Sequence, residues 1–159
     1  MIISFFLVIP LASFSDSTAP QTTIESHAVC PGSVVTSALT VIGFTDISSI
    51  SLRIDYNPTF IDFDTAININ PLLTGLIIHK VNVSPTLSKI KIAWVNVMPV
   101  SISDGDNILE LVFNYISGDE ILSFNNQSNG GSDCEYADSD GNPLLDTPTG
   151  SYYFNGQIT

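Results

Sequence analysis

The sequence is poor in basic side chains. Its 159 residues include only four Lys and Arg against 16 Asp and Glu, which gives a net charge of −12 at pH 7. Such a chain repels the phosphate backbone, so nucleic acid is not an expected partner, and an anionic membrane surface is equally unsuitable. The sequence also lacks an apolar run of the roughly 20 residues that span a bilayer, so membrane insertion is not expected. The acidity favours a soluble extracellular protein whose carboxylates are free for calcium.

Residues typical of catalytic sites are scarce as well. The only two histidines, His27 and His79, lie far apart in the sequence. There is no His-Glu-x-x-His zinc motif, no Gly-x-Ser-x-Gly nucleophile motif and no glycine-rich phosphate loop before a helix. Two carboxylates in a cleft would be enough for a glycosidase, but among 16 acids such a pair carries no specificity. We therefore predict that the protein is not an enzyme.

Residues 1–15 resemble a secretory signal peptide. An apolar run from Ile2 to Leu11 is followed by Ser13 and Ser15, which suit the −3 and −1 positions of a signal-peptidase site. No Lys or Arg precedes the run, so we interpret the leader as truncated at its start. A buried first strand is the alternative interpretation. The leader predicts a secreted or cell-surface protein.

The two cysteines, Cys30 and Cys134, are few enough to form at most one bridge. A secreted chain matures in an oxidising compartment, so we predict a Cys30–Cys134 disulfide that pins the first part of the domain to a segment near its end. Two separate buried thiols are the alternative. Neither cysteine has a second cysteine or a histidine at metal-ligand spacing, which disfavours a zinc site.

The chain is dominated by short runs in which apolar and polar residues alternate, the period of a half-buried β-strand. The clearest runs cover residues 49–56, 89–94 and 108–114, and no stretch shows a convincing helical period. Further strands are predicted near residues 22–29, 34–43, 60–64, 75–83, 120–127 and 152–158. Nine short strands predict one all-β domain over residues 22–159, a nine-stranded jelly-roll β-sandwich, with a long polar excursion at 125–150.

The excursion contains a candidate calcium loop. Asp138, Asp140 and Asn142 have the spacing of the first three oxygen ligands of such a loop. Position 149 is Thr where an EF-hand needs a bidentate Glu, so an EF-hand is excluded. A looser structural calcium site and a solvated turn rich in Asp, Gly and Asn remain the two interpretations. No other cofactor is predicted.

Aromatic residues give little support to a sugar-binding platform, which needs two or three coplanar exposed rings. The single tryptophan, Trp94, has the same parity as its apolar neighbours and is predicted to lie in the core. Tyr152 and Tyr153 are adjacent and must point to opposite faces in a strand. Tyr136, in the polar excursion, is the ring that a polysaccharide could contact.

Several runs together resemble cohesin domains. Residues 47–61 resemble an alternating strand that ends in a Tyr-Asp-Pro-type turn, here Tyr56-Asn57-Pro58. Residues 90–94, 101–113 and 153–158 resemble later strands of the family, so that the resemblance covers roughly residues 22–159. It implies a non-catalytic nine-stranded jelly roll. The family's role is to hold dockerin-bearing enzymes on a scaffold for polysaccharide breakdown, and dockerins carry duplicated calcium loops.

The resemblance also implies where a partner binds. In cohesins the dockerin lies on a sheet that includes the strand before the Tyr-Asp-Pro turn, whose exposed positions here are Ser49, Ser51 and Arg53. Lys89 and Lys91 are expected to be exposed on the later core strand. By parity Arg53, Lys89 and Lys91 face away from the apolar set, so they form either a basic patch that steers an acidic partner or an ordinary solvated face.

The leading hypothesis is therefore a secreted protein-binding module whose partner is a dockerin-type or other protein domain. A carbohydrate-binding or adhesive cell-surface module of the same fold, with a polysaccharide as partner, is the first alternative. A fragment of an enzyme that lacks its catalytic domain is the second.

Overall fold

The structure is a computed structural model that describes residues 17–127 and 133–159. The predicted signal peptide, residues 1–15, lies outside the described residues. Within them are one short 3-10 turn, η1 (Thr149–Ser151), and eleven strands: β1 (Gln21–Ile24), β2 (Val34–Ile42), β3 (Ile47–Tyr56), β4 (Ile61–Ile67), β5 (Ile77–Ser84), β6 (Leu87–Val100), β7 (Asn107–Tyr115), β8 (Glu120–Phe124), β9 (Glu135–Ala137), β10 (Tyr153–Phe154) and β11 (Gly156–Ile158). The described part of the chain forms no helix that could span a membrane.

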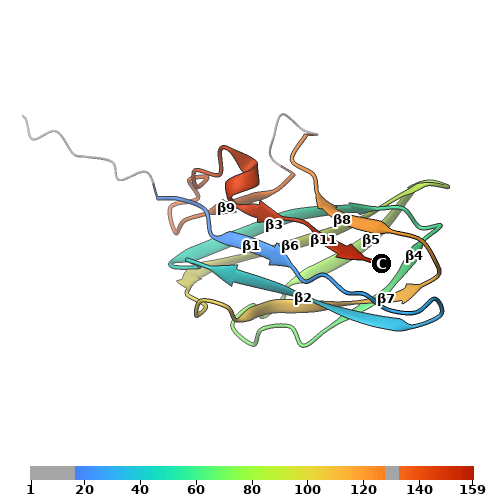
Figure 1. The fold of residues 1–159 in the computed structure, drawn as a ribbon. Coiled ribbons are helices and arrows are strands. Elements are labelled where there is room, and N and C mark those ends of the chain that lie inside the picture. Colours follow the sequence, from blue (N-terminus) through green and yellow to red (C-terminus); the bar gives the residue numbers. More distant parts are fainter. Residues whose placement is uncertain (1–16, 128–132) are drawn as a thin grey trace, which may run out of the picture.

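The strands form two stacked sheets (Figure 1). One sheet has the order β10-β1-β2-β7-β4, and the other has the order β11-β8-β3-β6-β5, with β9 also paired to β3. Strands β1 and β10 run parallel, whereas the other pairs within the sheets are antiparallel. This architecture confirms the predicted all-β jelly-roll sandwich.

Alternation of side chains produces the core, as the sequence predicts. On β3, Leu52 and Ile54 point inward, and their Cα partners on β6 are Ile92 and Ile90. All four side chains are at most 1% exposed. Trp94 continues this row and is buried, with its indole N–H donating to the carbonyl oxygen of Thr74 at 3.1 Å. The packing of two such rows face to face is what holds the sheets together.

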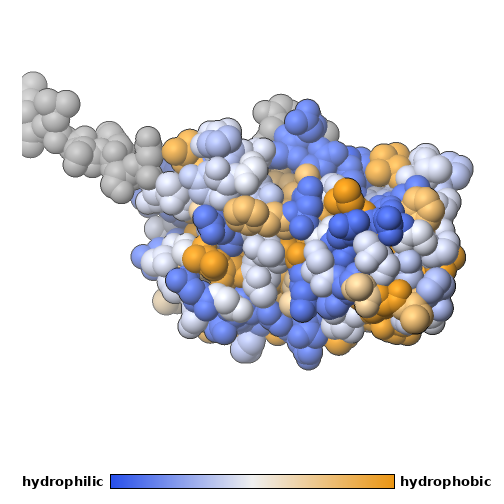
Figure 2. Space-filling model, in the orientation of Figure 1, coloured by the Kyte–Doolittle hydropathy of each residue, from blue (hydrophilic) through white to orange (hydrophobic). Residues whose placement is uncertain are grey.

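Outside the core, polar and apolar residues mix. On the side of the molecule seen in Figure 2, hydrophobic residues stand in small separate groups among hydrophilic ones. Strand β7 departs from the simple alternation, because Ile108 and Val112 are buried although their parity predicts a solvated face. On the neighbouring strand β2 of the same sheet, Val34 is 67% exposed, which is ordinary for a single surface valine.

The strand count exceeds the predicted nine for two reasons. The predicted strand at 152–158 splits, because β10 pairs with β1 in one sheet and β11 pairs with β8 in the other. The chain therefore crosses between the sheets at Asn155. A Cβ on Gly156 would lie 2.6 Å from Ile24 Cγ2 and 2.9 Å from the Glu25 carbonyl oxygen, so only glycine fits this crossing. The second extra strand, β9, belongs to the excursion.

The described residues of the polar excursion lie partly inside the domain. Cys134 and Tyr136 are fully buried and Leu144 is 8% exposed. The Tyr136 hydroxyl lies 2.7 Å from Thr22 Oγ1, and its ring stacks on Tyr153 with centroids 6.5 Å apart. Burial raises the pKa of the Tyr136 phenol well above its usual value. Tyr136 is a core residue and cannot serve as an exposed sugar-binding ring.

The predicted Cys30–Cys134 disulfide was also wrong. Both thiols are free: Cys30 is exposed in the turn before β2, whereas Cys134 is buried beside β3 in the other sheet. The Arg53 backbone N–H donates to Cys134 Sγ at 3.4 Å. Burial raises the pKa of the Cys134 thiol to about 11, so the reactive thiolate is disfavoured. Cysteine count and spacing carry no information about which sheet each residue enters.

Candidate functional site

The outer face of the six-stranded sheet carries the residues predicted to bind a partner. Strands β3 and β6 are neighbours, so Arg53 and Lys91 are Cα partners, as are Asp55 and Lys89. Strand β5 follows on the other side of β6 and forms the edge of the sheet. We call the outward residues of β5 and β6 the open face: Ile77, His79, Val81, Lys89, Lys91, Ala93 and Val95.

The open face combines exposed apolar side chains with small ones. Ile77 is 65% exposed and Val95 79% exposed, and Ala93, the Cα partner of Ile77, lies in the row between them. On the neighbouring strand, Ser49 and Ser51 are opposite Val95 and Ala93. Small side chains at these positions leave room for another backbone or helix to approach the sheet closely. Exposed apolar residues grouped in this way are typical of interaction surfaces.

A bulge extends the apolar surface at one end. Ser49 pairs with Val95 but Ile47 pairs with Val100, so β6 advances five residues while β3 advances two. The extra residues protrude, and among them Val97 is 93% exposed and Met98 is 74% exposed. Bulges redirect side chains in this manner at functional edges of sheets. Alternation alone places Val95 on the outer face but does not predict the bulge.

Arg53 does not belong to the open face, which corrects the sequence prediction. Arg53 is only 6% exposed. Its Nε and Nη2 atoms donate to the two oxygens of Asp55, each at 2.7 Å, and Nη1 donates to Asp133 Oδ2 at 2.8 Å. The hydrogen bonds and charges of Asp55 and Asp133 raise the pKa of the guanidinium. A partner cannot use a cation that is already enclosed by two carboxylates.

The chain encloses Arg53 because two strands share one side of β3. Strand β8 pairs with Asp55, and β9 pairs with Ser51. Between these two ladders, Cys134 Sγ accepts the Arg53 backbone N–H and the Arg53 carbonyl accepts the Asn125 N–H at 3.0 Å. The start of β9 brings Asp133 over the guanidinium. The outward direction of the Arg53 side chain was predicted correctly. Its burial, however, is caused by Asp133, which lies 80 positions away in the sequence.

The remaining basic residues divide into two kinds. Lys80 on β5 forms an ion pair with Asp62 on β4 and so links the edges of the two sheets. Asp62 raises the pKa of the Lys80 ammonium. Within residues 17–127 and 133–159, neither Lys89 nor Lys91 has an ion-pair partner. The basic patch is therefore reduced to these two lysines, which lie beside the apolar part of the open face.

The candidate calcium loop is a hydrogen-bonded turn. Asp138 Oδ1 accepts the backbone N–H groups of Asp140 and Asn142, each at 2.9 Å, and Oδ2 accepts the Asn142 side-chain amide at 3.2 Å. These bonds to Asn142 and Asp140 lower the pKa of the Asp138 carboxyl. Among the described residues, no three His, Cys, Asp or Glu side chains gather into a metal site. The geometry thus favours the turn over the calcium site.

Comparison with known proteins identifies the fold. Neither a scan against protein-family models nor a search of curated proteins finds a match to this chain. Solved structures are similar in three dimensions. The solution structure of CaCohA2 from Clostridium acetobutylicum has a TM-score of 0.68 at 17% identity, over 90% of this chain and 91% of that chain. The sixth cohesin of scaffoldin B from Acetivibrio cellulolyticus, in complex with a Cel5 dockerin, has a TM-score of 0.66 at 18% identity, over 89% and 99%.

The similarity extends beyond these two bacterial structures. A non-cellulosomal cohesin from the archaeon Archaeoglobus fulgidus has a TM-score of 0.63 at 16% identity, over 89% of this chain and 90% of that chain. At such identities the likeness concerns the fold. The chain therefore has the cohesin fold over nearly the whole described length, as the sequence resemblance predicts.

Proposed function

We propose that this domain is a non-catalytic protein-binding module that docks a partner domain of dockerin type on the open face. The observation behind this proposal is that Ile77 and Val95 are exposed on the open face, near two lysines that have no ion-pair partner among the described residues. Several structures of the same fold, including the Acetivibrio cohesin, are complexes with dockerins. On this basis we propose that the partner of this chain is also a dockerin-type domain.

The distribution of charge on the domain favours one orientation of the partner in such a complex. The chain carries a net charge of −12, so Lys89 and Lys91 make a local cationic site on an acidic body. An acidic segment of a partner is attracted to that site and repelled elsewhere, which steers encounter and fixes register more than it adds affinity. The apolar group around Val95 would then supply most of the binding energy, since central desolvated contacts dominate interfaces.

The proposal includes the setting of the module. We place it outside the cell, secreted or on the cell surface, in an assembly linked to polysaccharide breakdown. Two observations support this setting: residues 1–15 resemble a signal peptide, and the sequence motifs resemble cohesins. The open face offers no enclosed cleft with paired carboxylates, and its residues are suited to holding a partner rather than to transforming a substrate.

The test is binding of purified type I dockerin domains by biolayer interferometry, with calcium or EDTA in the buffer. We expect binding in calcium only, since dockerins fold around calcium. Val95→Asp should weaken it on the order of tenfold or more, because it places a charge in the apolar contact. The matched control is Val34→Asp, an equally drastic change at an exposed valine on the other sheet. Equal effects of the two variants would show that the partner does not use the open face.

A second measurement addresses the lysines. Lys91→Glu should lower the association rate and flatten its dependence on salt, while the dissociation rate changes little. If no dockerin in the panel binds the wild-type domain, the dockerin-type partner is wrong for this chain.

A further inference from the structure

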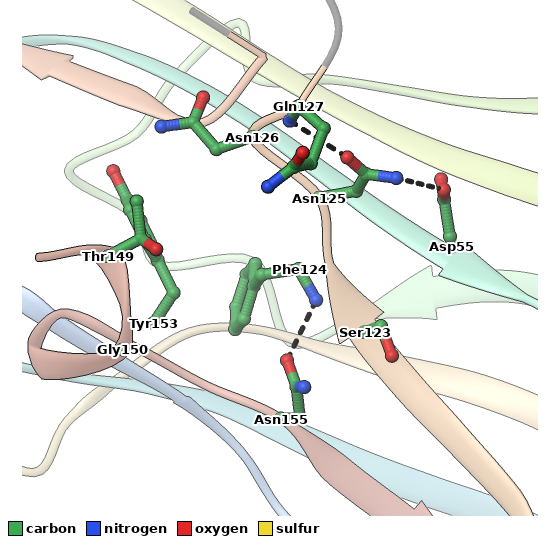
Figure 3. Close-up of a pocket in the computed structure, with 10 residues that line it drawn as sticks. All are labelled: Asp55, Ser123, Phe124, Asn125, Asn126, Gln127, Thr149, Gly150, Tyr153 and Asn155. Carbon is green, nitrogen blue, oxygen red and sulfur yellow. Dashed lines mark hydrogen bonds between the residues drawn. The ribbon is translucent and has the colours of Figure 1, made fainter. Parts of the chain in front are cut away.

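A pocket of about 410 Å³ opens on the rim of the sandwich (Figure 3). It borders the open face, because Asp55 in its lining is the Cα partner of Lys89. It lies where β8 ends and where the chain crosses between sheets from β10 to β11. Its size falls in the usual range of small-molecule sites. The lining residues are Asp55, Ser123, Phe124, Asn125, Asn126, Gln127, Thr149, Gly150, Tyr153 and Asn155.

The pocket offers no uncompensated charge. Among the described residues that line it, Asp55 is the only one with a carboxylate, and both of its oxygens accept hydrogen bonds from Arg53. One of them also accepts the Asn125 side-chain amide at 2.7 Å. A cationic ligand would have to compete with a guanidinium already in place, and an anion would be repelled by a chain of charge −12. The pocket therefore suits a neutral ligand.

Hydrogen-bond donors and acceptors both line the pocket. Asn155 Oδ1 accepts the Phe124 backbone N–H at 2.9 Å, which fixes the amide and leaves its NH₂ group without a hydrogen bond to any described residue. The side chains of Ser123, Gln127 and Thr149 likewise make no hydrogen bond within the described part of the chain. Amides and hydroxyls donate and accept at once, which is what neighbouring hydroxyl groups of a ligand require.

An aromatic wall completes the site. Phe124 and Tyr153 pack with ring centroids 5.4 Å apart, and the Tyr153 hydroxyl donates to Asp146 at 3.1 Å, which holds its ring in place. In Figure 3, Phe124 lies at the centre, with Thr149 and Tyr153 on one side and Asn125 on the other. Such a surface packs against the C–H groups of a saturated ring while the amides meet its hydroxyls.

We propose that this pocket binds a neutral saccharide of one or two rings. No residue of the pocket belongs to the open face, so this second activity is independent of the docking proposal. It also differs from a flat polysaccharide platform, which would need several coplanar exposed rings. The domain could then hold a protein partner and a sugar at the same time.

The test is titration of the ¹⁵N-labelled domain with glucose, xylose, mannose, galactose, cellobiose and N,N′-diacetylchitobiose, with glucuronate as the anionic counterpart of glucose. We expect at least one neutral sugar to shift the backbone resonance of Phe124 and the side-chain amide of Asn155. Glucuronate should shift neither. If no neutral sugar in the panel moves the resonances of the pocket, the proposal is wrong.

Two conservative variants make the assignment specific. Asn155→Asp keeps the acceptor for the Phe124 N–H but removes the free donors, and Thr149→Val replaces an exposed hydroxyl by a methyl group of equal size. Each should weaken sugar binding about tenfold, the usual effect of one lost hydrogen bond to a ligand. Val95→Asp on the open face should leave sugar binding unchanged. Sugar affinities that are equal in all three variants and the wild type would overturn the assignment.

Discussion

Replacing Arg53 by Met removes the cation that holds two buried carboxylates together. The Arg53, Asp55 and Asp133 side chains are only 7%, 12% and 6% exposed. Methionine fills much of the same volume, so the loss concerns charge and hydrogen bonds rather than a cavity. Breaking a buried ion pair from one side typically costs about 3–5 kcal/mol, because the remaining charge stays desolvated. A domain of this size has roughly 5–15 kcal/mol in total, so the variant should fold but with a large loss of stability.

Lys91→Met is the matched control, because Lys91 is the direct Cα partner of Arg53 across β3 and β6. Lys91 is exposed and, among the described residues, has no ion pair, so the change should stay within about 0.5 kcal/mol. The assay is urea unfolding with linear extrapolation, at low and at high salt. The deficit of Arg53→Met should persist in high salt, since buried pairs are weakly screened. Equal stability of the two variants would refute the enclosed network and restore Arg53 to the exposed patch that parity alone suggests.

The remaining predictions concern the two thiols, the Glu120 carboxyl and the Tyr136 hydroxyl. The native protein should show one thiol reactive with Ellman's reagent, Cys30, and a second, Cys134, only after unfolding; no reactive thiol in either state would mean a disulfide. Desolvation raises the pKa of the Glu120 carboxyl in the fold, so its charge destabilises the native state once the pH exceeds the pKa of an unfolded Glu. Glu120→Gln should therefore raise Tm at pH 7 and lose this advantage below about pH 4, where both states are protonated; a gain independent of pH would contradict it. Tyr136→Phe should cost about 1–2 kcal/mol of unfolding free energy in denaturant titrations, because Thr22 loses its hydrogen-bond partner in the core; an unchanged midpoint would disprove that bond.

Alternation of side chains was sufficient to predict the class of fold. It depends only on local sequence, and the inward rows of β3 and β6 are where the pattern places them, from Leu52 and Ile54 to Trp94. Glycine at 156 and the change of sheet at Asn155 could not be predicted in this way. Their cause is the close approach of β1, more than 100 residues earlier in the chain, and no local period encodes it.

The candidate site was predicted in part for the same reason. Parity gives the direction in which a side chain points, and it was right for Arg53, Lys89 and Lys91. It cannot give burial, which depends on what a distant segment places over the side chain. Asp133 covers Arg53 from a polar stretch whose composition is that of a solvated loop. Tyr136 belongs to the same stretch and lies in the core. The wrong predictions for Arg53 and Tyr136 therefore have one source.

The described residues of the excursion at 125–150 contribute to both proposed binding surfaces. It adds β9 to the side of β3 and places Asp133 against the Arg53 guanidinium, while β5 and β6 stay accessible, so the proposed docking surface is the open face. On its other side the same segment supplies Asn125 and Thr149 to the rim pocket. The ion pair between Arg53 and Asp55 stands between the two, since Asp55 lines the pocket while Arg53 is the Cα partner of Lys91 on the open face. A buried charge network costs stability when it is incomplete, and here it stands at the boundary between the proposed docking surface and the proposed sugar pocket.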